Sequence, residues 1–131
     1  MDTVINRVLP NDYRKLVFKV TGEKIKEVKA IDIMRNSALT VGLYEDGELM
    51  AFGRVCGDRA MYYLVCDVFI DENAPYLGLA EIVIKEIDDY LKAVSDRHSK
   101  AIVMSDPRYD RLWRSLGFKY IDSDYRSILE R

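Results

Sequence analysis

The strongest constraint on the fold comes from residues 39–70, where two turn signals divide a long stretch rich in β-forming residues. Asp46-Gly47 is a residue pair that tolerates the positive φ angles of a two-residue hairpin turn. Gly57-Asp58-Arg59 supplies a second turn signal one strand later. The stretch therefore predicts a meander of three antiparallel strands, at about 39–45, 48–56 and 60–70.

Helical patterns flank this meander. Before it, a short strand is expected over 3–9, followed by a helix ending at Gly22 and a second helix that ends near Asn36. After it comes the clearest amphipathic helix of the chain, whose apolar residues form one stripe: Ala80, Val83, Ile84, Ile87, Leu91 and Val94. A buried strand over 101–104, a helix starting at Pro107 and ending at Gly117, and strands over 118–121 and 127–129 complete the pattern.

This order of elements predicts a mixed α/β (α+β) fold, with a mainly antiparallel central sheet of about six to seven strands flanked by about four helices. The length of 131 residues fits one domain spanning 1–131, since domains typically hold roughly 100–200 residues.

Composition narrows the classes of function. The chain has 20 basic and 22 acidic residues, so it lacks the basic field of a nucleic-acid or anionic-membrane binder. Its longest apolar stretch, 60–66, is too short to cross a membrane, and its first ten residues do not have the pattern of a signal peptide. A cytoplasmic protein is expected, with Cys56 and Cys66 interpreted as small core residues kept reduced.

The most informative position for chemistry is the start of the long helix. Gly78 and Ala80 would lie in its first turn, where backbone N–H groups have no internal partner and the helix dipole is positive. Small residues there let a diphosphate approach closely. The same small residues also suit tight packing of a helix on a sheet, so both interpretations stay open on the residues alone.

The order of elements resembles that of the GNAT superfamily of acyl-CoA-dependent N-acetyltransferases over nearly the whole chain. The family's pyrophosphate motif, Gln/Arg-x-x-Gly-x-Gly/Ala, is matched by Gly78 and Ala80, with Pro75 where Gln or Arg is usual; the window is Pro75-Tyr76-Leu77-Gly78-Leu79-Ala80. The segments YEDGELMAFGRVCGD, CDVFI and LWRSLGF are similar to the family's second and third strands, its fourth strand, and its last helix-to-strand segment.

The resemblance implies that acetyl-CoA is the cosubstrate. No metal site is expected, because the spacing of Asp67, Asp71 and Glu72 matches no known divalent-ion loop. Its pantetheine arm would lie between the fourth and fifth strands against main-chain groups of Val68, Phe69 and Ile70, and its phosphates would meet the loop from Pro75 to Ala80. The acetyl group would pass to a primary amine of a small molecule or peptide by direct attack in a ternary complex.

Three further residues can be given roles in the light of this resemblance. Asp67 is the one acid within the expected fourth strand and is a candidate base, or else an acid on the open face of the sheet. Trp113 stands where many members have a tyrosine that protonates the leaving thiolate, and it is interpreted as core or as a wall of the acyl pocket. Tyr109, one helical turn earlier, is the candidate acid, or else a residue that packs or faces solvent.

Two alternatives to an active enzyme remain. Pro75 and Trp113 depart from the family pattern, which favours an acyl-CoA-binding module acting as a sensor or interaction protein with little catalysis. A small α/β interaction domain that binds no CoA would use Gly78 and Ala80 for packing alone. A homodimer is expected, because short sheets leave edges able to pair.

Overall fold

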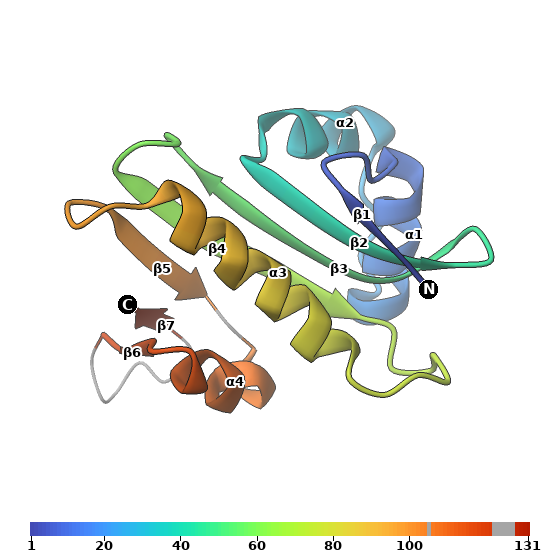
Figure 1. Cartoon of the computed structure of the whole chain (residues 1–131). Coiled ribbons are helices and arrows are strands. Elements are labelled where there is room, and N and C mark those ends of the chain that lie inside the picture. The colour runs from blue at the N-terminus through green and yellow to red at the C-terminus, as the bar shows by residue number, and fades with distance from the viewer. Residues whose placement is uncertain (105, 122–127) are drawn as a thin grey trace.

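A computed structural model of the chain describes residues 1–104, 106–121 and 128–131 (Figure 1). These residues form one seven-stranded sheet of order β1-β2-β3-β4-β5-β7-β6. The strands are β1 (Asp2–Ile5), β2 (Leu39–Glu45), β3 (Glu48–Gly57), β4 (Tyr62–Ile70), β5 (Lys100–Met104), β6 (Lys119–Tyr120) and β7 (Ile128–Glu130). The helices are α1 (Pro10–Thr21), α2 (Glu27–Asn36), α3 (Leu79–Val94), the 3₁₀ turn η1 (Pro107–Tyr109) and α4 (Asp110–Ser115).

The predicted fold class is confirmed. Every neighbouring strand pair among the described residues is antiparallel except β4 and β5, which run parallel. A parallel pair needs a long crossover, and α3 provides it between these two strands. None of the described helices is long and apolar enough to span a membrane.

Helices cover both faces of the sheet (Figure 1). On one face, α3 packs Val83, Ile87 and Leu91 into the main core formed with β2, β3, β4 and β5. On the other face, Tyr13, Leu16 and Val17 of α1 pack with Ala30 of α2 and Phe52 of β3. Gly53 of β3 permits the close approach of α3, because a Cβ at this position would lie 2.6 Å from Cγ1 of Val83.

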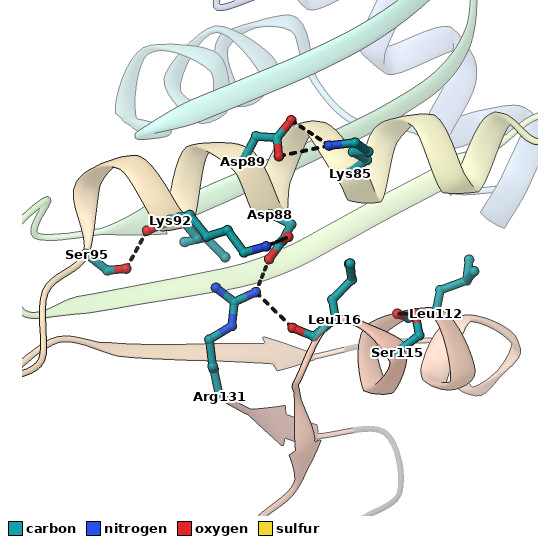
Figure 2. Close-up of polar contacts among 10 residues, drawn as sticks. Lys85, Asp88, Asp89, Lys92, Ser95, Leu112, Ser115, Leu116 and Arg131 are labelled. Atoms are coloured by element: carbon teal, nitrogen blue, oxygen red, sulfur yellow. Dashed lines mark hydrogen bonds and ion pairs between the residues drawn. The ribbon is translucent and has the colours of Figure 1, made fainter.

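An ion-pair cluster ties the last described strand to α3 (Figure 2). Asp88 of α3 is only 2% exposed, and its carboxylate binds the guanidinium of Arg131, which follows β7. Lys92, one turn along α3, lies 3.0 Å from the other carboxylate oxygen. The guanidinium also donates a hydrogen bond to the Leu116 carbonyl and stacks over the Phe118 ring. This buried acid is therefore neutralised by cations from two elements.

The meander prediction is confirmed by β2, β3 and β4, and the Asp46-Gly47 turn has the expected positive φ angles of 50° and 77°. The first strand is shorter than predicted and ends at Ile5. Asn6 takes a φ of 59° and accepts a hydrogen bond from the Thr40 N–H through its side-chain oxygen, which turns the chain out of the sheet. The expected last strand included Ser127, which lies outside the described residues.

Candidate functional site

The central feature of the site is a divergence between β4 and β5. The two strands pair only where 62–65 face 100–103. Beyond Val65, β4 continues to Ile70 while pairing with β3, so its residues 66–70 have no strand partner on the β5 side within the described part of the chain. The described part of β5 ends at Met104, so the main chain of β4 beyond Val65 has no strand beside it on this side.

A β-bulge lies at the point where the divergence begins. Arg54 of β3 faces Asp67, but the next pair is Val55 with Val65, so Cys66 is an extra residue in β4. A bulge bends its strand and increases the local twist, which turns the second half of β4 away from its neighbour. The bulge also decides which way Asp67 points, since a shift of one residue exchanges the faces of a strand.

Asp67 belongs to a polar cluster on the face that carries α1 and α2. Its Oδ2 forms an ion pair with Nε of Arg54 and accepts a hydrogen bond from the Tyr13 hydroxyl at 3.3 Å. The side chains of Arg54 and Asp67 are 18% and 16% exposed. Burial first, and then the negative charge of Asp67, raises the pKa of Tyr13, so its phenol stays protonated and acts as a donor. Any further donor that binds this oxygen would compete with these two.

The loop after β4 leads to the start of α3 at Gly78. Gly78 adopts a left-handed conformation with φ of 78°, and no side chain caps the helix. The Gly78 carbonyl accepts from the N–H of Ile82, so the donors available at this end are the N–H groups of the first turn. A Cβ at Gly78 would meet only Oε2 of Glu81, at 3.8 Å.

The residues of this loop differ in exposure. Tyr76 is 41% exposed and Leu77 is 99% exposed, whereas Leu79 is buried in the core and Ala80 is half-buried. The helix end is therefore open to solvent, with Glu81 as the acidic side chain of its first turn.

An ion pair links this loop to the segment after β5. Nη1 of Arg108 in η1 binds the carboxylate of Glu72, and Nη2 lies 2.8 Å from Asp106. A cavity of about 150 Å³ lies beside the pair, lined by Lys19, Val20, Ile70, Asp71, Glu72, Asn73 and Arg108. These contacts bring α1, the end of β4 and η1 together at the open end of the divergence.

Tyr109 and Trp113 occupy different surroundings. Tyr109 packs against the edge of the main core, and partial burial foremost raises its pKa, so the phenol retains its proton at neutral pH. Trp113 has no exposed surface and meets Phe118 edge-on, with ring centroids 5.2 Å apart. Its indole N–H has no hydrogen-bond partner in the described part of the structure. Trp113 is thus a core residue.

The sequence did not point to Tyr13, Arg54 or Arg108 as members of the site. Tyr13 is 54 residues from Asp67 in the chain, and its helical spacing indicated only a core position. Arg54 carries a usable signal, because the predicted turn at 57–59 pairs its strand with the strand that holds Asp67. The cysteines differ from the core interpretation, since Cys56 and Cys66 are both partly exposed.

No family model matches the chain, and no curated protein matches it. Several solved structures match it in fold. A probable acetyltransferase of meticillin-resistant Staphylococcus aureus superposes with a TM-score of 0.82 at 22% identity, covering 94% of this chain and 92% of the other. A GNAT family acetyltransferase of Streptococcus pneumoniae gives 0.71 at 15% identity, over 92% and 89% of the two chains.

A GNAT family N-acetyltransferase of Escherichia coli, solved in complex with CoA, gives a TM-score of 0.69 at 14% identity, over 99% of this chain and 79% of the other. The protein has the GNAT fold. The strand order, the parallel β4–β5 pair and the bulge described above shape the candidate site in this chain.

Proposed function

We propose that this protein binds acetyl-CoA at the divergence of β4 and β5 and transfers the acetyl group to a primary amine. The observation that carries the proposal is the main chain of β4 at residues 66–70, which has no strand partner on the side of β5 in the described structure. Unpaired main-chain groups on a strand are ready to bind another extended chain. The amides of a pantetheine arm would meet the main chain of Val68, Phe69 and Ile70.

The start of α3 is the proposed site for the diphosphate. The N–H groups that follow Gly78 would bind the phosphate oxygens, and the helix dipole favours their negative charge. The absence of a side chain at Gly78 and the small side chain of Ala80 leave room for this approach. Leu79 anchors the helix end in the core, while Pro75, Tyr76 and Leu77 would form the outer wall.

The proposed reaction is direct attack within a ternary complex. The amine nitrogen attacks the thioester carbonyl carbon, the C–S bond breaks, and the thiolate leaves with the electron pair. Asp67 would accept a proton from the attacking amine, and Tyr109, which retains its proton at neutral pH, would return one to the thiolate. Trp113 would support the acyl pocket from within the core.

One observation favours a second function, an acyl-CoA-binding module with little or no catalysis. The carboxylate oxygen of Asp67 is already held by Arg54 and Tyr13. If substrate binding leaves these contacts in place, the protein would bind acetyl-CoA without accepting a proton from an amine.

Titration calorimetry with acetyl-CoA and desulfo-CoA tests the binding step, and thiol release with a panel of amines tests transfer. Gly78→Asp and Gly78→Asn form a matched pair, because both side chains tolerate the left-handed conformation and differ chiefly in charge. Asp should weaken acetyl-CoA binding at least about tenfold more than Asn, a difference of about 1.4 kcal/mol. Equal affinities of the two variants, or no binding of either nucleotide, would contradict the proposal.

A further inference from the structure

Two cysteines face each other across β3 and β4. Sγ of Cys56 and Sγ of Cys66 lie 3.5 Å apart, and both residues are free thiols and partly exposed. By register, Cys56 pairs with Leu64, and Cys66 is the extra residue of the bulge. Strand alternation from the Cys56–Leu64 pair sets Cys66 on the same face as Cys56, the side of α1 and α2, where its Sγ contacts Sγ of Cys56.

The two sulfurs have unequal surroundings. Nη1 of Arg54 donates a hydrogen bond to Sγ of Cys56 at 2.9 Å, so a guanidinium contacts this sulfur directly. Burial foremost raises the pKa of the Cys66 thiol to about 12, so Cys66 carries its proton at neutral pH. The charged and polar groups around the pair are Arg54, with Asp67 and Ser37 bound to it, and the hydroxyl of Tyr13, which is bound to Asp67.

We infer that Cys56 and Cys66 form an intramolecular disulfide when the protein meets a two-electron oxidant such as hydrogen peroxide. The sulfurs must approach from 3.5 Å to a bond length of about 2.0 Å. An unpaired bulge residue can move in this way without breaking a ladder hydrogen bond of its own. The inference rests on the sulfur geometry and does not depend on the proposed function.

The chemistry balances in two steps. The Cys56 sulfur attacks one oxygen of the peroxide, the O–O bond breaks, and the released hydroxide takes the proton of Cys56 as water, leaving a sulfenic acid on Cys56. The Cys66 sulfur then attacks the sulfenic sulfur, the S–O bond breaks, and the leaving hydroxyl takes the proton of Cys66 as water. Two thiols and one peroxide give one disulfide and two waters. The disulfide would lie where the pairing of β4 with β5 ends. Its formation would weaken the hydrogen bond that Arg54 donates to the Cys56 sulfur.

The test uses the whole chain treated with hydrogen peroxide and analysed by mass spectrometry without reduction. We expect the loss of two hydrogen atoms, the disappearance of both alkylatable thiols, a peptide that joins Cys56 to Cys66, and full reversal by dithiothreitol. Cys56→Ser and Cys66→Ser each serve as the other's control, and neither should lose two hydrogen atoms.

A sulfenic acid trap such as dimedone tests the order of the steps. Cys66→Ser should accumulate an adduct on Cys56 at least about tenfold faster than Cys56→Ser accumulates one on Cys66. Two thiols that survive oxidant doses consuming a free thiol, or disulfides that form only between chains, would overturn the inference. Equal adduct rates in the two variants would overturn the assignment of Cys56 as the first sulfur oxidised.

Discussion

Arg54 and Asp67 face each other across β3 and β4 and form an ion pair at the bulge where β4 begins to diverge from β5. The pair holds Asp67 on the face of α1, where Tyr13 completes its hydrogen bonding. Both side chains are less than one-fifth exposed, so the removal of one partner leaves the other poorly solvated.

The first prediction concerns this pair. Arg54→Met should lower the free energy of unfolding by about 1–3 kcal/mol, because it leaves a mostly buried carboxylate without its cation. The double variant Arg54→Met/Asp67→Leu should be less destabilised than the sum of the single variants, with a coupling of about 0.5–3 kcal/mol. Urea unfolding of the four proteins measures this cycle. Strict additivity would mean that the two side chains do not stabilise each other.

The second prediction concerns the contact between the sheet and α3. Gly53→Ala should destabilise the protein by about 1–3 kcal/mol, because the added methyl overpacks the interface. Its Cβ would lie 2.6 Å from Val83 and 2.8 Å from Ile87. Thermal unfolding provides the measurement. Val83→Ala supplies the control, since combining it with Gly53→Ala should recover part of the loss that each change causes alone; a full sum of losses would refute the steric explanation.

The third prediction concerns pH. Oδ1 of Asp58 accepts hydrogen bonds from the N–H groups of Ala60, Met61 and Tyr62, at 2.9, 2.8 and 3.1 Å, and these lower its pKa below the usual 3.8. A carboxyl whose pKa is lower in the folded state stabilises the fold above its unfolded pKa, and this contribution declines as the pH falls below 3.8 and through the folded pKa.

Asp58→Asn preserves the shape of the side chain and removes its charge. The variant should therefore be less stable than the wild type at neutral pH, and the difference should shrink in acid below pH 3.8. Chemical denaturation at a series of pH values measures it. A gap that stays constant throughout the acid range would rule out titration of Asp58 as its cause.

The fourth prediction concerns the cluster of Figure 2. Arg131→Met should destabilise the protein by about 1–3 kcal/mol, because the buried carboxylate of Asp88 loses the less exposed of its two cations. Lys92→Met is the matched control: Lys92 binds the same carboxylate but is 60% exposed, so its loss should cost about 0.5 kcal/mol. Equal costs in denaturant titrations would indicate that the two cations contribute alike.

The elements of this fold follow largely from local signals in the sequence. The turn at Asp46-Gly47 and the apolar stripe of α3 each depend on residues close together in the chain, so both could be predicted. The candidate site depends on a different kind of information. Gly78 was identified because a helix start can be recognised locally, whereas the partner of Asp67 depends on a bulge that the alternation of side chains does not reveal.

The bulge between β3 and β4 illustrates this limit. The Val55–Val65 pair, continued without a bulge, would set Arg54 opposite Cys66 and turn Asp67 toward α3. One extra residue in β4 instead brings Asp67 to Arg54 and Tyr13. The sequence therefore located Asp67 in the correct strand, but its neighbours could be identified only from the three-dimensional arrangement.

The brief pairing of β4 with β5 also has a mechanical consequence. Only four positions of β4 pair with β5, and this pairing joins the meander to β5, β7 and β6 among the described residues. By contrast, β3 and β4 pair along most of their length. Under conditions that favour partial opening, the C-terminal strands should detach as one cooperative unit before the meander separates. Amide hydrogens of Ile102 and Val103 would then exchange with solvent sooner than those of Val41 and Phe52, because the β4–β5 pairing would open first.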